Sequence, residues 1–285
     1  MDEEIYSFFC WQLTKKICLI TGVTSGLGRS LAIKLSNEGY NLILVAKSKV
    51  KLKSLSKKLG KSDIQYFDVD LSSFKEINQF TKKISNVDIL INNAGNFYLK
   101  KEKNNKKINK TIMINYFAPF YLIKKLILEK KLKKKLVINI SSHTIIKSRI
   151  PLSKIKNLTD YNGWEIYKFS KLLIFLIINI LSKKYKNINF ISFDPGRMRT
   201  NFGSGNNIFV RYLTKLYLKI LGKNPIKLAN KIIKIIKIYP NNINLIKTID
   251  FNNNSLNLEF FNLKKQKELL NQTEKIIRDN EKKLI

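Results

Sequence analysis

The sequence has few of the residues that build cross-linked or metal-held folds. It contains two cysteines, Cys10 and Cys18, and one histidine, His143, in 285 residues. Two cysteines indicate no disulfide framework, and one histidine argues against a histidine-based catalytic triad or a zinc site. A chain of this length buries roughly three quarters of its unfolded surface on folding, so its core needs no such support.

Acidic residues and alanine are also scarce. Lys and Arg number 54 against 20 Asp and Glu, which gives a net charge of +34, and alanine occurs five times. Such a charge attracts nucleic acid and anionic membranes. The lysines, however, are spread over every expected helix, and excess Lys, Asn and Ile at the expense of Ala is typical of biased coding. We therefore expect no specific nucleic-acid partner, although anionic ligands will be attracted.

Long hydrophobic runs and a basic leader are missing as well. The chain starts Met-Asp-Glu-Glu, which has the wrong charge for a secretion signal, and its longest apolar run, Leu172 to Leu181, is too short to span a bilayer. We expect a cytoplasmic protein. Residues 204–221 mix aromatic, apolar and basic side chains, which suits either peripheral contact with a membrane surface or a helix that faces its own core.

The pattern of apolar residues alternates between strand and helix. Continuous apolar runs separated by amphipathic segments predict an α/β fold, a Rossmann-like doubly wound parallel sheet of about seven strands in a single domain. Residues 14–251 would form the dinucleotide-binding domain, with an N-terminal extension over 1–13 and a C-terminal helical tail over 252–285. We expect strands at 16–21, 41–46, 63–67, 88–92, 136–141, 188–193 and 245–251.

Three of the 11 glycines fall in the turn between the first strand and the first helix. The turn reads Thr21-Gly22-Val23-Thr24-Ser25-Gly26-Leu27-Gly28. Glycines let the backbone turn tightly and approach a pyrophosphate, while the helix N-terminus presents free N–H groups. The turn therefore predicts a nucleotide-phosphate site.

The Gly-x-x-x-Gly-x-Gly spacing resembles the short-chain dehydrogenase/reductase family, and the resemblance spans roughly residues 14–250. Asn92-Asn93-Ala94-Gly95 after the fourth strand matches a structural signature of that family. The family implies a dinucleotide bound by the glycine turn, by the second signature, by an acidic residue with its neighbour near the adenine, and by a Pro-Gly-x-x-x-Thr stretch near the nicotinamide. The residues at these positions are Thr21, Gly22, Ser25, Gly26, Leu27, Gly28, Asp70, Leu71, Asn93, Ala94, Gly95, Pro195, Gly196 and Thr200.

The end of the second strand bears on the choice between the two nicotinamide dinucleotides. Folds that bind NAD place a carboxylate there for the ribose 2′-hydroxyl. This strand ends Ala46-Lys47-Ser48-Lys49, with no acid, and Lys47 stands where relatives that use NADP often have a basic residue. We predict NADP(H) in preference to NAD(H).

Tyr167 and Lys171 lie four residues apart, on one face of an expected helix. An ammonium close to a phenol lowers its pKa and lets the tyrosine act as acid or base. Tyr121 and Lys125 have the same spacing, so spacing alone does not select the pair. We select Tyr167 because its helix follows the fifth strand, which ends in two serines. The family resemblance implies that Lys171 also holds the cofactor ribose.

The remaining catalytic candidates also follow strand ends or lie on helices. Alternation along a strand lets only one of Ser141 and Ser142 face the site, and the family pattern favours Ser142 as the residue that orients the substrate oxygen. Asn115 matches a helix asparagine that in the family holds a water near the lysine. An asparagine satisfied within the core would look the same.

The separation of 25 residues between Ser142 and Tyr167 resembles the retinol-dehydrogenase-like branch of the family. That branch implies an NADP(H)-dependent oxidoreductase that interconverts an alcohol and a carbonyl on a lipophilic small molecule. The alternative is a catalytically weak NAD(P)-binding regulatory protein of the same fold. The run from Leu172 to Leu181 resembles the helix through which family members form homodimers, and a buried core helix would read identically.

Overall fold

A computed structural model describes residues 16–59, 63–99, 108–142, 144–145, 148–196, 222–238, 247–249 and 263–282. Its centre is a seven-stranded sheet in the order β3-β2-β1-β4-β5-β6-β7, with every neighbouring pair parallel. The expected Rossmann-like fold is confirmed. The strands are β1 (Ile17–Thr21), β2 (Asn41–Ala46), β3 (Ile64–Asp68), β4 (Val87–Asn92), β5 (Leu132–Ile140), β6 (Asn189–Phe193) and β7 (Lys247–Ile249).

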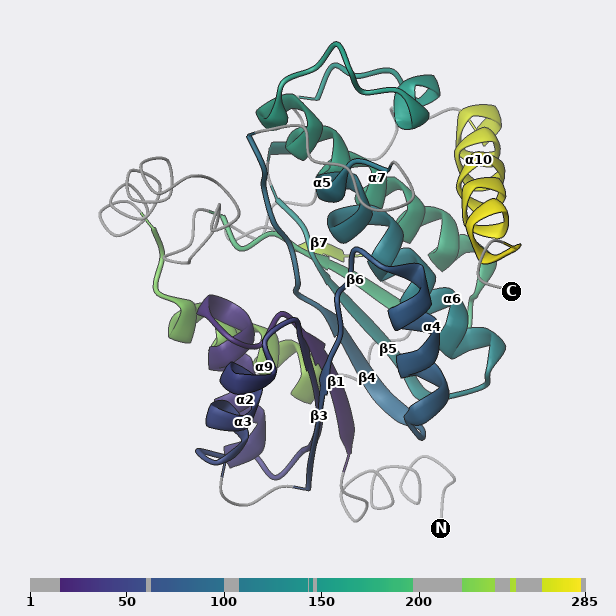
Figure 1. Ribbon diagram of the computed structural model, residues 1–285. Coiled ribbons are helices and arrows are strands. Elements are labelled where there is room, and N and C mark those ends of the chain that lie inside the picture. The colour runs from purple at the N-terminus through teal and green to yellow at the C-terminus, as the bar shows by residue number, and fades with distance from the viewer. Residues whose placement is uncertain are drawn as a thin grey trace.

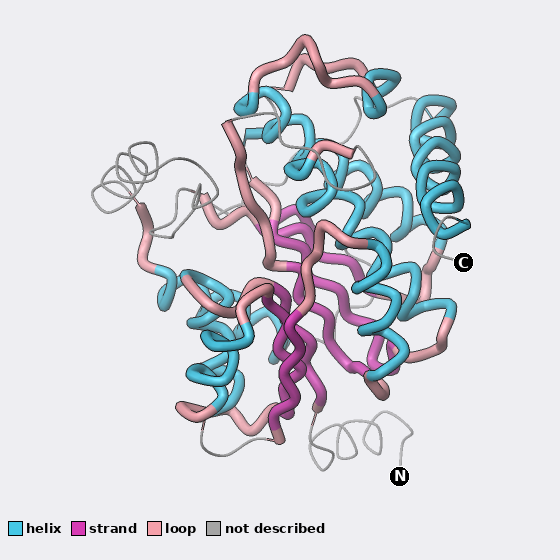
Figure 2. The backbone as a smooth tube through the Cα atoms, in the orientation of Figure 1, coloured by secondary structure: helices cyan, strands magenta, loops and turns pink. Residues whose placement is uncertain are grey.

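Helices cover both faces of this sheet (Figures 1 and 2). One face carries α2 (Gly26–Asn37), α3 (Lys49–Ser56) and α9 (Pro225–Ile238). The other carries the segments that follow β3, β4, β5 and β7. These are α4 (Phe74–Lys83), α5 (Lys110–Ile112), η1 (Met113–Phe117), α6 (Ala118–Leu128), η3 (Leu152–Lys156), α7 (Gly163–Lys184) and α10 (Leu263–Glu281).

Apolar side chains from both faces of the sheet form two cores. Leu19 and Leu90 point to the α4–α7 side, whereas Ile20 and Ile91, one residue on, point to the α2–α9 side. This alternation explains why the strands read as unbroken apolar runs in the sequence. The order places the topological switch point between β1 and β4, where ligands bind in such sheets.

The sequence predicts one long helix from about 108 to 131, and the structure differs from it in two respects. The turn Met113–Phe117 is π-helical, and the helix ends earlier, at Leu128. Pro119 has no N–H to donate to the carbonyl of Asn115, so the regular hydrogen-bond ladder is interrupted in this turn. The turn carries Asn115 into the site described below.

Lys110–Leu128 is long and apolar enough to cross a membrane, but 72% of its most apolar window is buried inside the fold, as in a core helix. α10 packs against α7 and α4, and Leu269 and Ile277 on α10 are buried. Part of the α7 surface is therefore covered by the chain itself. The N-terminal extension and the segment 204–221 lie outside the described residues.

Candidate active site

The glycine turn after β1 forms a cradle that has no room for side chains. Gly22 and Gly26 have φ of +73° and +54°. A Cβ on Gly28 would lie 2.4 Å from both Asn93 Nδ2 and the Gly22 carbonyl oxygen. Ser25, the N-cap of α2, makes no side-chain capping bond, so the first N–H groups of the helix keep the anion-binding capacity of a helix N-terminus. These features fit a dinucleotide pyrophosphate.

Hydrogen bonds join this turn to the end of β4. Thr21 Oγ1 accepts from the backbone N–H groups of Asn93 and Ala94 at 3.1 and 3.0 Å. The Asn93 amide donates in return to the carbonyls of Thr21 and Gly22 at 2.9 and 3.1 Å. The two strand ends at the switch point are thus fixed to each other.

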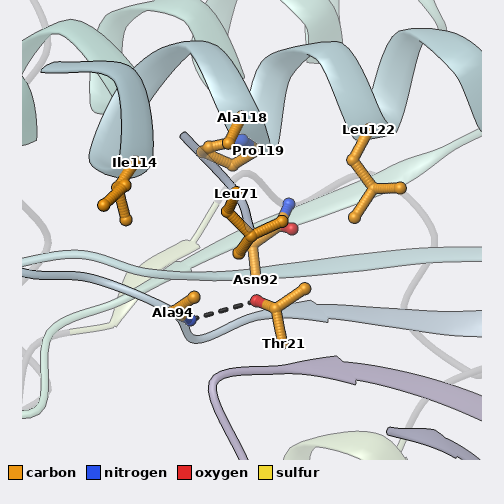
Figure 3. Close-up of a pocket in the computed structure, with 8 residues that line it drawn as sticks. All are labelled: Thr21, Leu71, Asn92, Ala94, Ile114, Ala118, Pro119 and Leu122. Atoms are coloured by element: carbon orange, nitrogen blue, oxygen red, sulfur yellow. Dashed lines mark hydrogen bonds between the residues drawn. The ribbon is translucent and has the colours of Figure 1, made fainter. Parts of the chain in front are cut away.

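A small recess lies beside these bonds, between the sheet and the helix that begins with η1 (Figure 3). It encloses about 200 Å³ of empty space, counting its open side. The Asn92 side chain points into it, and its amide nitrogen is buried without a hydrogen-bond partner among the described residues. The lining residues are Thr21, Leu71, Asn92, Ala94, Ile114, Ala118, Pro119 and Leu122.

The two residues assigned to the adenosine end, Lys47 and Asp70, contact each other. Ala46 and Asp68 are paired in the parallel register of β2 and β3, so the residues after them leave the sheet together. Lys47 Nζ lies 2.5 Å from Asp70 Oδ2. The sequence argument that no carboxylate lies at the end of the second strand is therefore wrong, because the segment after β3 places Asp70 there.

Tyr167 and Lys171 are both buried on α7, with 7% and 6% of their surface exposed. Lys171 Nζ donates to the carbonyl of Ile140, the last residue of β5, at 2.9 Å. A Cβ on Gly95 would lie 3.5 Å from Lys171 Nζ and 3.4 Å from Asn115 Oδ1. The ends of β4 and β5, the π-helical turn and α7 therefore converge at this lysine.

Burial determines the protonation of this pair. It lowers the pKa of Lys171 to about 8 and raises the pKa of Tyr167 to about 12. We expected the ammonium to lower the tyrosine pKa. In the structure the desolvation of the phenolate outweighs the hydrogen bond with the Ser142 side chain, which acts in the opposite direction. At pH 7 the phenol therefore keeps its proton and the lysine is charged.

Ser142 faces Tyr167, and its Oγ also lies 3.0 Å from Thr144 Oγ1. The Ser141 hydroxyl is buried without a partner among the described residues. Asn115 is 2% exposed, and its side chain is bonded to the backbone N–H and carbonyl of Asn96 and to Ser170 Oγ, each at 2.9 Å. These bonds show that Asn115 fixes the loop after β4, and a role in holding a water near Lys171 stays a prediction.

The competing pair, Tyr121 and Lys125, is occupied elsewhere. Tyr121 donates to Glu281 Oε1 on α10 at 2.6 Å, and Lys125 lies 3.2 Å from Glu129 Oε1. Both contacts lie on the outer helices and not at a strand end.

Asp194 is a site residue that the sequence analysis did not single out. It follows β6 directly, is 4% exposed, and accepts from the Gly196 N–H at 2.8 Å. Its charge raises the pKa of both Tyr167 and Lys171. Its place at a strand end, before Pro195 and Gly196, was the available signal. Thr200 lies outside the described residues.

The sequence profile of the short chain dehydrogenase family matches residues 16–207, more than half of the chain. The chain belongs to the short-chain dehydrogenase family. As a short-chain dehydrogenase it is an oxidoreductase with a Rossmann-like domain that acts on small molecules.

Curated relatives in this short-chain dehydrogenase family include reductases and dehydrogenases. The chain is 31% identical over 238 residues to the 3-oxoacyl-(acyl-carrier-protein) reductase FabG of Buchnera aphidicola, covering 78% of this chain and 90% of that one. It is 29% identical over 207 residues to retinol dehydrogenase 13 of Homo sapiens, covering 68% of this chain and 62% of that one. The second match bears out the resemblance to retinol dehydrogenases.

Solved structures share the fold at low identity. An alcohol dehydrogenase from Thermococcus sibiricus, complexed with 5-hydroxy-NADP, has a TM-score of 0.64 at 21% identity and covers 84% of this chain and 96% of its own. A short chain dehydrogenase/reductase from Burkholderia phymatum, complexed with NAD, has a TM-score of 0.61 at 15% identity and covers 78% and 86%. The neighbours thus include complexes of both dinucleotides.

Proposed function

We propose that the protein is an NADP(H)-dependent oxidoreductase that interconverts an alcohol and a carbonyl on a lipophilic small molecule. One observation carries the proposal: Tyr167 and Lys171 are both buried one helical turn apart on α7, with Ser142 against Tyr167 and the Ile140 carbonyl at the end of β5 bound to Lys171. The loop after β4 lies beside Lys171 and is hydrogen-bonded to the glycine cradle. The oxidoreductase family, the FabG relative and the retinol dehydrogenase relative support the reaction class.

The bound dinucleotide would supply or accept the hydride. The turn from Gly22 to Gly28 would hold its pyrophosphate, and Asn93, Ala94 and Gly95 would line the path toward Lys171. Tyr167 Oη, protonated at neutral pH, would donate its proton to the carbonyl oxygen in reduction and take it back in oxidation.

The neighbours of Tyr167 would orient the substrate and support that proton. The Ser142 hydroxyl lies against Tyr167 and would bind the same substrate oxygen. Lys171, charged at pH 7 and fixed by the Ile140 carbonyl, would stabilise negative charge on the phenolate that forms when the proton leaves. Burial of all three side chains excludes water and strengthens these interactions.

We base the preference for NADP(H) on Lys47. Its side chain is 78% exposed, so its ammonium is accessible to the ribose 2′-phosphate that distinguishes NADP(H) from NAD(H). Its pair with Asp70 places one charge of each sign at this end of the site. We propose that the 2′-phosphate replaces the Asp70 carboxylate as the partner of Lys47. Asp70 would then hold the adenine amino group.

A cofactor and substrate screen tests the proposal. Binding of NADPH and NADH is titrated by nicotinamide fluorescence, and absorbance at the nicotinamide band is then followed with a panel of aldehydes and ketones. We expect tighter binding of NADPH and carbonyl-dependent oxidation of it. Tight NADPH binding without turnover on any panel member would instead support the regulatory protein, and preference for NADH would overturn the cofactor assignment.

A further inference from the structure

Three aromatic side chains adjoin the proposed proton donor. The Trp164 indole stacks on the Tyr167 ring with centroids 5.3 Å apart and an angle of 19° between the planes. Phe97 meets both rings edge-on, at 5.6 Å from Trp164 and 5.9 Å from Tyr167. Trp164 stands three residues before Tyr167 on α7, so one helical turn places both rings on the same side of the helix.

The loop that carries Phe97 is held at both ends. Asn115 binds the backbone N–H and carbonyl of Asn96, each at 2.9 Å. At the other end, a Cβ on Gly163 would lie 2.2 Å from the Tyr98 carbonyl oxygen, so only glycine lets the loop lie against the first turn of α7. Phe97 itself is 7% exposed and forms the buried part of the cluster.

Trp164 and the adjacent Leu99 reach solvent. Each is 43% exposed, and the Leu99 Cα would lie 2.7 Å from a Cβ on Gly163, the residue before Trp164. Large apolar side chains exposed together mark binding surfaces more often than single ones do. Trp164, which is exposed on one side and stacks on Tyr167, connects solvent to the buried tyrosine whose hydroxyl is the proposed proton donor.

We propose that Trp164, with Phe97 and Leu99, is the determinant of substrate specificity, and that the indole selects carbonyls or alcohols attached to a flat, conjugated or aromatic ring. This inference rests on the proposed function. The exposed indole gives such a ring a stacking partner while its carbonyl reaches Tyr167, whereas a puckered saturated ring of the same size cannot stack. Trp164, Phe97 and Leu99 would therefore select substrates whose ring is flat as well as apolar.

A matched pair of ketones tests the kinetic consequence. Acetophenone and cyclohexyl methyl ketone have the same carbon skeleton and carbonyl and differ in the planarity of the ring. We expect the ratio of their kcat/KM values to fall about threefold to tenfold in Trp164→Leu and to recover in Trp164→Phe. The ratio cancels any general damage to Tyr167, and an unchanged ratio in Trp164→Leu would overturn the proposal.

A binding readout separates this inference from the proposed activity. Trp11 and Trp164 are the two tryptophans of the chain, so the Trp11→Phe variant has a single indole N–H signal in a ¹H–¹⁵N correlation spectrum. With NADP⁺ present, acetophenone should shift that signal through its ring current and cyclohexyl methyl ketone should shift it far less. A shift of the Trp164 signal with acetophenone but no turnover would refute the proposed oxidoreductase activity and support the ring-binding site. No shift, or equal shifts with both ketones, would refute the ring-binding site.

Discussion

Lys47 Nζ and Asp70 Oδ2 lie 2.5 Å apart, although 23 residues separate them in the chain. The parallel register of β2 and β3 brings the two strand ends together. The hydrogen bond to Asp70 raises the pKa of Lys47 and, with the Ser72 N–H and hydroxyl, lowers the pKa of Asp70 against the effect of its burial. A charged pair therefore stands where we propose that the adenosine ribose of the dinucleotide binds.

Removing the lysine should abolish the preference for the phosphorylated cofactor. In Lys47→Ala, the Kd of NADPH should rise about tenfold and that of NADH should hardly change, because only NADPH loses a charge-assisted hydrogen bond. Lys53→Ala removes an exposed lysine from α3 and is the matched control for net charge. Equal changes for both dinucleotides in Lys47→Ala would contradict the assignment.

Removing the carboxylate should act in the opposite direction. Asp70→Asn keeps a hydrogen-bond acceptor for the Ser72 N–H but releases Lys47 from its ion pair. Both Kd values should rise if Asp70 binds the adenine amino group, and the Kd of NADH should rise more because the freed lysine compensates only for NADPH. A lower NADPH-to-NADH preference than in the wild type would contradict this reading.

The low pKa of Lys171 should appear in the dependence of stability on pH. Its folded-state pKa is about 8 against 10.5 for an ordinary lysine. Between these values the unfolded chain holds a proton that the folded protein has released, so the free energy of unfolding rises with pH across the window. Below pH 8, burial of the charged lysine lowers the free energy of unfolding by about 3 kcal/mol.

Urea unfolding of Lys171→Met measures this cost. The variant lacks the titrating group. Its free energy of unfolding minus that of the wild type should therefore be about 3 kcal/mol larger at pH 7 than at pH 10.5. The comparison cancels other titrations, including that of Tyr167. Lys183→Met, an exposed position on the same helix, is the control and should not reproduce that difference. A difference independent of pH would show that Lys171 is not desolvated as described.

Because the glycine cradle has no room for a side chain, adding one methyl group at Gly28 should weaken both stability and NADPH binding. Gly28→Ala places a Cβ against Asn93 Nδ2 and the Gly22 carbonyl, so the turn must move. We expect a loss of about 1–3 kcal/mol in unfolding free energy and at least tenfold weaker NADPH binding. In Gly39→Ala the new Cβ meets nothing within 4 Å, so that control should lose about 1 kcal/mol through its φ of +82° and keep its affinity. Unchanged NADPH binding in Gly28→Ala would place the pyrophosphate elsewhere.

Residues that are neighbours along the chain were the predictable part of this protein. The apolar runs predicted β1, β2, β4, β5 and β6 because these strands are largely buried, and a shorter run predicted the edge strand β3, which is partly exposed. The glycine turn could be placed because strand, turn and helix are consecutive. The start of β5 was missed because its first four residues read Leu-Lys-Lys-Lys, which is no apolar run. The π-helical turn was missed, although Pro119 inside the expected helix was an available signal that the hydrogen-bond ladder is interrupted there.

Contacts between distant residues could not be predicted. The Lys47–Asp70 pair depends on the register of two strands, and the contact of Phe97 with Trp164 depends on a loop that Gly163 admits. The protonation of Tyr167 depends on burial, which no local pattern gives. Spacing alone did supply one overlooked clue, since Trp164 stands a helical turn before Tyr167.

The most direct test of the proposed mechanism is a single-turnover measurement on Tyr167→Phe. NADPH binding is titrated first, and hydride transfer to a carbonyl accepted by the wild type is then followed by stopped flow. The mechanism predicts a transfer rate at least about 100-fold lower with the Kd of NADPH within about twofold of wild type. A variant that binds NADPH and transfers hydride at the wild-type rate would show that the Tyr167 hydroxyl does not supply the proton.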